Sequence, residues 1–292
     1  MNKEREGEIL AILLSVLEGI FPIWSILAVK KIGAVHSYAG GIFFALIFFS
    51  FLIFYRKKTK ELIKKEALKD LLLTSILITF MFVLIYLGLS YTTAGNMSVI
   101  LLMQIFFSYL YFNIFGKEKM GVIHSLGALL MGIGALIVLF PGEFHLNKGD
   151  MLILLAAATA PIANLYQKKA REKVSSETVL FFRTIFAFPI LIFLASIFEP
   201  NVSIESYREV LIYLILNGFL VLGIGKILWI EALHRISITK LSAMASFIPL
   251  FTLIFAYLFL KETPTKAQIV GAFIIITGSF FITYKKNIKK RL

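Results

Sequence analysis

The chain has 292 residues, of which 59% are hydrophobic and 16% charged, and it carries a formal net charge of +13. Its mean hydropathy of +0.88 is too high for a soluble domain of this length, so the composition indicates a membrane protein. The basic residues lie in loops and near the C-terminus rather than on one folded face, so no nucleic-acid partner is expected.

Ten apolar runs are long enough to cross a bilayer, for which a helix needs about 17 to 25 residues. They cover residues 9–29, 37–55, 71–90, 95–115, 122–140, 151–167, 178–198, 210–231, 238–260 and 267–284. None alternates polar and apolar residues as barrel strands do, so the expected fold is an all-α integral membrane protein with ten transmembrane helices. The first run has no small-residue cleavage site behind it and is expected to remain as the first helix.

The distribution of Lys and Arg predicts how these helices are oriented, because cytoplasmic loops carry the excess of basic residues. With the N-terminus inside, the inner segments hold 22 of them and the outer loops 6, while Arg183 and Lys226 lie within spans. Both termini are therefore expected in the cytoplasm. The basic run from Arg56 to Lys69 is interpreted as a topology determinant rather than a lipid or ligand site.

The first helix has one polar face, whose residues recur at three- and four-residue steps. Its members are Ala11, Ser15, Glu18, Pro22 and Ser25. Glu18 lies about nine residues, or roughly 13 Å, from the inner end, where a lone carboxylate normally faces a cavity or a partner. A protonated Glu18 bonded to a neighbouring helix is the alternative, and a role in coupling or substrate binding is favoured.

Polar side chains also occur inside the fourth and sixth helices. Asn96, Ile100 and Gln104 follow one stripe of the fourth helix, and lining of a cavity is slightly favoured over contact between helices. In the sixth helix a run of alanines leads to Pro161 and Asn164, a surface that allows close approach or leaves space beside it. Both stripes are interpreted as inward faces.

The eighth helix carries Lys226 about six residues from its inner end, at a depth similar to that of Glu18. An ion pair between them would lower the cost of burying each charge, and two opposite charges in an aqueous cavity would also suit a zwitterionic substrate. Arg183 in the seventh helix is expected to reach the lipid headgroups by snorkelling. The candidate cavity residues are Glu18, Pro22, Trp24, Tyr86, Asn96, Gln104, Asn164, Lys226, Trp229 and Ser246.

The same pattern occurs twice along the chain, 144 positions apart. Gly127 and Gly134 recur as Gly271 and Gly278, and Lys117-Glu118 recurs as Lys261-Glu262. Glycines seven residues apart in an apolar helix favour close helix packing over ligand binding. The repeat divides the chain into two five-helix halves, residues 1–145 and 146–292, and an odd number of helices per half predicts that the halves insert with opposite orientation.

Motifs for catalysis are absent from the sequence. The four histidines show no metal-ligand spacing, and there is no GxSxG, HExxH or Walker-type phosphate loop. The chain has no cysteine, which excludes disulfides and Cys-based metal sites. We therefore expect neither enzyme activity nor a metal or other cofactor.

These features resemble the EamA-type family of the drug/metabolite transporter superfamily, over essentially the whole chain. The most specific part runs from Ile248-Pro249 through Phe259-Leu260-Lys261-Glu262 to Gly271 and Gly278. The first half departs from the family pattern at Ile105 and at Phe115-Gly116-Lys117-Glu118. The resemblance implies a carrier in the cell (inner) membrane that moves amino acids, related metabolites or drugs, usually outward. It also implies a cavity lined by the first, third, fourth, sixth, eighth and ninth helices.

The expected function is a secondary transporter that works by alternating access, with coupling to protons or to exchange left open. A passive channel in which Glu18 and Lys226 form a filter is the second hypothesis, and saturable uptake with counterflow would favour the carrier over it. A scaffold subunit without transport is the third, and the polar inward faces argue against it. A small-molecule substrate and membrane lipids are the expected partners of a monomer or homodimer.

Overall fold

The computed structural model describes residues 3–114, 121–140, 147–236, 241 and 244–283, and the regular elements in these ranges are all helical. In chain order they are α1 (Lys3–Ile32), α2 (Ala34–Tyr55), the 3₁₀ helix η1 (Thr59–Ile63), α3 (Lys65–Leu89), α4 (Ala94–Leu101), α5 (Met103–Ile114), α6 (Val122–Leu139), α7 (Lys148–Arg171), α8 (Ser176–Phe198), α9 (Ile204–Leu216), the π-helix η2 (Asn217–Gly225), α10 (Lys226–Arg235), α12 (Ile248–Phe255), the π-helix η3 (Ala256–Leu260) and α13 (Lys266–Thr283). The repeat residues Lys117 and Glu118 and the basic C-terminus lie outside the described residues.

Eight of the described helices are long and apolar enough to cross a membrane. Two shorter apolar helices, Ile248–Leu260 and Lys266–Ile282, lie where the ninth and tenth spans are predicted. Large apolar side chains remain on the outside of the bundle, and Phe193 and Phe273 are 64% and 72% exposed, as expected where hydrocarbon covers a protein. The prediction of an all-α, multi-pass membrane protein is confirmed for the described part of the chain.

Two predicted spans are less regular than single helices. The fourth is interrupted at Leu102 between α4 and α5, and the eighth passes from α9 through the nine-residue η2 into α10. The η2 segment contains Gly218, Gly223 and Gly225, and glycine lowers the stability of a regular α-helix. Wider π-helical turns often occur at functional sites, and Lys226 directly follows this one.

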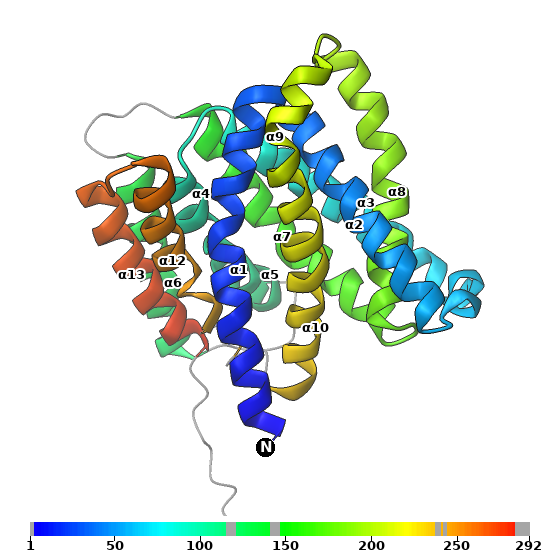
Figure 1. Cartoon of the computed structure of the whole chain (residues 1–292). Coiled ribbons are helices and arrows are strands. Elements are labelled where there is room, and N and C mark those ends of the chain that lie inside the picture. The colour runs from blue at the N-terminus through cyan, green and yellow to red at the C-terminus, as the bar shows by residue number, and fades with distance from the viewer. Residues whose placement is uncertain (1–2, 115–120, 141–146, 237–240, 242–243, 284–292) are drawn as a thin grey trace, which may run out of the picture.

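The arrangement of the helices brings the two halves of the chain into one bundle (Figure 1). α1 packs against α9, α10 and α12, α3 packs against α7, and α2 packs against α8. α6 and α13 form the most extensive helix pair and lie at one edge of the bundle in Figure 1. One continuous apolar core contains side chains of α1, α2 and α3 together with those of α7 and α8. The interior of the bundle is therefore built by both halves.

α6 and α13 touch through four glycines. A Cβ atom added at Gly127 would lie 2.6 Å from the carbonyl oxygen of Gly278, and one added at Gly134 would lie 2.9 Å from the carbonyl oxygen of Gly271. Neither distance leaves room for a side chain. The residue nearer the start of α6 meets the residue nearer the end of α13, so the two helices run antiparallel at this contact.

Candidate functional site

Glu18 and Lys226 form an ion pair between the two halves. Glu18 lies in the middle of α1 and Lys226 begins α10, and Lys226 Nζ donates to Glu18 Oε1 at 2.5 Å. Each side chain is 18% exposed, so the pair is largely withdrawn from the surface. The two charges that the sequence placed at similar depths therefore meet directly.

Two glycines lie next to the pair. A Cβ atom added at Gly225 would be in ordinary contact with Glu18 Oε1, at 3.9 Å, so the end of η2 passes beside the carboxylate. Gly19 follows Glu18 and brings α1 close to α12, where Thr252 Oγ1 donates to the Gly19 carbonyl oxygen at 2.9 Å. The position of Glu18 is thus fixed by contacts with α12 and with the end of η2.

Aromatic side chains form a wall beside the pair. Lys226 Nζ lies 5.6 Å from the centre of the Phe82 ring, a distance at which a ring attracts a cation. Tyr38 stacks on Phe82 and on Tyr86, with ring centres 5.5 and 5.1 Å apart. Phe21 packs edge-on against Phe82 and Tyr86. All four rings are buried, and they come from α1, α2 and α3.

A short hydrogen-bonded chain extends from this wall. Asn217 Nδ2 donates to Ser25 Oγ at 3.1 Å, and Ser25 Oγ donates to Tyr86 Oη at 3.4 Å, which links η2 to α1 and α3. Asn217 Oδ1 is buried and has no hydrogen-bond partner in the described part of the structure. An unsatisfied buried acceptor is costly, so this oxygen is a candidate contact for water or a bound molecule.

Arg183 lies in the same region, and the expectation that it reaches the lipid headgroups is wrong. The residue is 3% exposed and falls on the buried face of α8, with Leu180, Ala187 and Leu191. α8 packs against α2 and α3, which separates this face from lipid. Glu18 lies within electrostatic reach of the guanidinium, so Arg183 belongs to the same charged interior.

Three further candidate residues lie on the two helices that carry the ion pair. Pro22 is buried in α1, one turn after Glu18. Trp24 on α1 and Trp229 on α10 are half-buried and pack against the common apolar core. With Tyr86, these residues lie on the helices that build the ion pair and the aromatic wall.

The other candidates lie elsewhere in the bundle. Gln104 on α5 and Asn164 on α7 are half-buried, and neither touches the ion pair in any described contact. Ser246 is fully buried and hydrogen-bonds to Ser279 of α13 at 2.7 Å. That bond joins Ser246 to the helix pair at the edge of the bundle.

Asn96 lies in a separate polar network, in α4 at the end of the bundle away from the chain N-terminus (Figure 1). Its Nδ2 donates to Asp150 Oδ2 at 3.0 Å, and its Oδ1 accepts a bond from Gln268 Nε2 at 2.8 Å. Thr92 also donates to Asp150. These bonds connect α4 with the first turns of α7 and α13, so Asn96 joins helices at the predicted outer side.

Sequence reasoning did not find Tyr38, Phe82 or Asn217. Tyr38 and Phe82 stand in apolar runs of a chain with 29 Phe and 11 Tyr, so nothing in the sequence distinguishes them. Asn217 did give a signal, because an amide inside the run 210–231 is as unusual there as Asn96 and Asn164 are in theirs.

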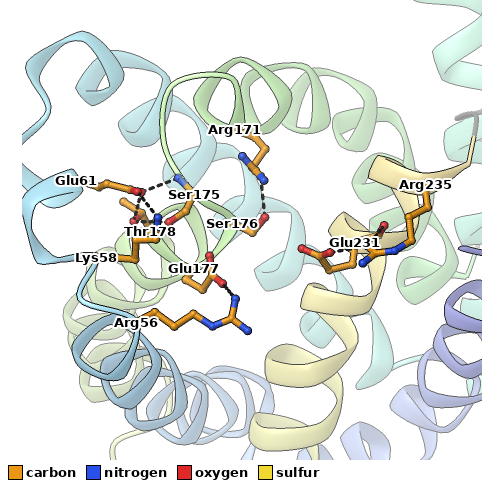
Figure 2. Close-up of polar contacts among 10 residues, drawn as sticks. All are labelled: Arg56, Lys58, Glu61, Arg171, Ser175, Ser176, Glu177, Thr178, Glu231 and Arg235. Carbon is orange, nitrogen blue, oxygen red and sulfur yellow. Dashed lines mark hydrogen bonds and ion pairs between the residues drawn. The ribbon is translucent and has the colours of Figure 1, made fainter. Parts of the chain in front are cut away.

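A second ionic network joins the halves at the end of the bundle where α2 and α7 finish, and Figure 2 shows its contacts. Arg56, which follows α2, pairs with Glu177 in the first turn of α8. Close by, Lys173 Nζ pairs with Asp70 Oδ2 at 2.5 Å, which connects the segment between α7 and α8 to α3. This is the end that the basic residues assign to the cytoplasm.

Glu61 of η1 is the most heavily hydrogen-bonded carboxylate of this network (Figure 2). It accepts bonds from the Ser175 backbone N–H at 2.6 Å, Thr178 Oγ1 at 2.8 Å and Lys58 Nζ at 3.0 Å. Partial burial alone would raise the pKa of Glu61, but the hydrogen bonds from Ser175, Lys58 and Thr178 outweigh it and lower the pKa to about 2. Glu61 thereby holds the start of α8 against the segment between α2 and α3.

We expect Glu61→Gln to lower the thermal unfolding temperature at neutral pH, with a loss of about 1–3 kcal/mol for the charged hydrogen bonds. Because the folded-state pKa of Glu61 lies below its ordinary value of 4.5, this contribution is fully present above pH 4.5 and is lost as the pH falls toward 2. Unfolding of the purified wild type and variant from pH 7 to pH 3 measures the difference, which should shrink below pH 4.5. Glu205→Gln, at a pair whose side chains are 74% exposed, is the control and should have little effect.

The fold and the site define the class of protein. Apolar helices surround an interior that holds three charged side chains and a hydrogen-bonded polar chain, an arrangement that is costly in a membrane protein without a functional reason. In the described ranges, His, Asp and Glu do not gather into a metal site. This is a multi-pass membrane protein with a polar interior. The chain belongs to the EamA-like transporter family, which matches residues 5–140 and again residues 147–284.

Relatives of the chain carry the names of transporters. The uncharacterized transporter YoaV of Bacillus subtilis (strain 168) is 29% identical over 248 residues, which cover 82% of this chain and 84% of YoaV. An uncharacterized transporter of Haemophilus influenzae is 24% identical over 253 residues, which cover 78% of each chain. The family and these relatives make the protein a membrane transporter, and they are not enzymes by name.

A solved structure shares the fold. It is a crystal structure of a protein that is 17% identical in sequence, superposes with a TM-score of 0.66, and covers 93% of this chain and 95% of its own. At this identity the comparison bears on the arrangement of the helices alone.

Proposed function

We propose that the protein is a secondary transporter that exports small metabolites, such as amino acids or drugs, by alternating access around the Glu18–Lys226 pair. The pair carries the proposal, because it joins α1 of the first half to α10 of the second in the interior of the bundle. A pair that bridges two halves is broken when they separate and restored when they close. Glu18 can couple transport either to protons or to the exchange of substrates, because its carboxylate can bind a proton or a cation.

The packing of equivalent helices supports an inverted repeat of ten helices. The last helices of the two halves, α6 and α13, meet antiparallel with Gly127 against Gly278 and Gly134 against Gly271. α3 of the first half packs on α7, the first helix of the second half, and α1 packs in the same way on the α9–α10 span. A two-fold axis in the membrane plane exchanges these two contacts, as alternating access requires.

The proposed topology predicts opposite accessibility of two loops. Single cysteines at Lys58 and Asn147, introduced into this cysteine-free chain, should react with an impermeant thiol reagent from opposite sides of the membrane. Lys58 should be labelled only after the cells are opened, because its loop is assigned to the cytoplasm. Labelling of both positions in intact cells would contradict the N-in, C-in arrangement and the inverted insertion of the halves.

Transport itself is tested by comparing metabolites in the medium of cells with and without the protein. Cells that produce the wild type should release at least one small metabolite faster than cells that produce an equal amount of a Glu18→Gln variant or none. A compound retained inside rather than released would reverse the proposed direction. No change in any compound, inside or outside, would contradict the transport function.

A further inference from the structure

Arg183 is a buried cation that has no anionic partner among the described residues. Its Nε is buried and makes no hydrogen bond in the described structure, and no carboxylate of the described residues lies within ion-pair distance of its guanidinium. An arginine stays protonated in proteins, so it cannot escape the cost of burial by losing its charge. A buried charge of this kind requires an anion nearby.

Glu18 does not fill this role, because Lys226 already neutralises it. Lys226 Nζ contacts Glu18 Oε1 at 2.5 Å, whereas Arg183 is only within electrostatic reach of that carboxylate. Among the described residues of this region, Lys226 and Arg183 are cations and Glu18 is the anion, so one positive charge remains unbalanced. Tyr38 also interacts electrostatically with Arg183 and is buried. Its hydroxyl is uncharged in the ordinary protonated form, so it does not balance the guanidinium.

The surroundings of Arg183 suit an organic molecule better than a bare ion. Tyr38 is within electrostatic reach of Arg183 and is part of the stacked wall with Phe82 and Tyr86. Aromatic faces contribute large apolar contact area to ligands. The wall leads through Tyr86 and Ser25 to the unsatisfied Oδ1 of Asn217.

We propose that Arg183 binds an anionic group of the transported substrate, of the size of a carboxylate, whose apolar part lies against the aromatic wall. The proposal rests on the transport function inferred above and adds the substrate class. A guanidinium presents paired N–H groups that fit the two oxygens of a carboxylate. Substrate binding would then balance the positive charge of Arg183. Arg183 lies on α8, the seventh predicted span, and the family resemblance did not include this span among the cavity-lining helices.

Matched aryl compounds test this inference on the purified full-length protein. Phenylacetate should raise the thermal unfolding temperature in a concentration-dependent way, since a ligand that binds only the folded state stabilises it. Phenylacetamide, which has the same ring without the charge, and phenethylammonium should not. Chloride at equal concentration distinguishes a free inorganic ion from an organic substrate: equal stabilisation by chloride and no additional effect of phenylacetate would overturn the proposal.

Arg183→Gln keeps the hydrogen-bonding shape and removes the charge. It should weaken the apparent affinity for phenylacetate about 10- to 100-fold, the effect expected for loss of a charged hydrogen-bonding partner. Its unfolding temperature without ligand should equal or exceed that of the wild type, because the Glu18–Lys226 pair stays balanced; a purely structural arginine predicts a decrease. Arg208→Gln, at an exposed arginine, is the matched control and should bind like the wild type.

Arg183→Lys keeps the positive charge and provides a second measurement if the Arg183→Gln protein does not accumulate. Its affinity for phenylacetate should lie between those of the wild type and Arg183→Gln. Equal stabilisation of the wild type by acid and amide would overturn the anion site, as would unchanged phenylacetate affinity in either Arg183 variant. Both of these results would leave the proposed transport function standing. That function is contradicted only if cells with and without the protein show no difference in any metabolite.

Discussion

Glu18→Gln is expected to abolish net transport and to destabilise the protein by about 3 kcal/mol, the lower end of the range for breaking a buried ion pair. The lower end applies because both side chains of the pair are 18% exposed. The loss arises because Lys226, whose Nζ now contacts Glu18 Oε1 at 2.5 Å, would be left largely buried without its carboxylate partner. Uptake into proteoliposomes and thermal unfolding of the same preparation measure the two effects.

The two assays also separate the roles of Glu18. If Glu18 carries protons, Glu18→Gln should lose transport driven by a pH gradient but keep exchange of substrate across the membrane. If Glu18 binds a cationic group of the substrate, both should fail. If it only balances Lys226, the double change Glu18→Gln with Lys226→Met should restore both folding and transport, since removing a buried pair together costs far less than leaving one charge alone. Full activity of Glu18→Gln in both assays would remove Glu18 from the mechanism.

Leucine at Gly271 or Gly127 is expected to prevent accumulation of folded protein rather than to change substrate preference. A Cβ atom at Gly271 would lie 2.8 Å from the Gly134 carbonyl oxygen, and one at Gly127 would lie 2.7 Å from the Ile282 backbone nitrogen. Because backbone atoms cannot move aside as a flexible side chain can, α6 and α13 must separate. The overpacking cost of about 1–3 kcal/mol for an added methylene group is a lower bound for this much larger change.

Gly132 provides the control on the same helix. A Cβ atom at Gly132 meets nothing within 4 Å, so Gly132→Leu should accumulate like the wild type. Fluorescent fusion proteins and size-exclusion profiles compare the amounts of folded protein. A Gly271→Leu protein that accumulated normally and lost one substrate selectively would show that this contact belongs to the transport pathway instead.

The sequence was informative wherever a residue type is rare in its surroundings. Glu18 and Lys226 stand out because charges inside apolar runs are costly, and their similar depth left open an ion pair that the structure contains. The glycines at a spacing of 144 residues predicted close packing, and the structure brings Gly127 to Gly278 and Gly134 to Gly271. For the charges, the cost of burial in hydrocarbon carries the information, and for the glycines the repeated spacing does.

Other features were beyond the sequence because these helices are apolar on every side. Without a polar face, periodicity does not separate the lipid side of α8 from its core side, so the burial of Arg183 could not be predicted. The same holds for Tyr38 and Phe82. Polar residues such as Ser246 and Asn96 bond to other helices as readily as they line a cavity, and a sequence does not distinguish these uses.

The antiparallel glycine contact has a consequence for the origin of the charge pattern. A pairing of Gly127 with Gly278 and of Gly134 with Gly271 is self-complementary, as in an isologous interface between two copies of one shorter ancestor. Such an ancestor would carry every charge twice. If the 144-residue spacing extends to the third and eighth spans, position 82 corresponds to position 226, and Lys226 Nζ lies 5.6 Å from the centre of the Phe82 ring. In one continuous chain the two positions can carry different residues, so a single cation faces an aromatic ring there rather than a second cation.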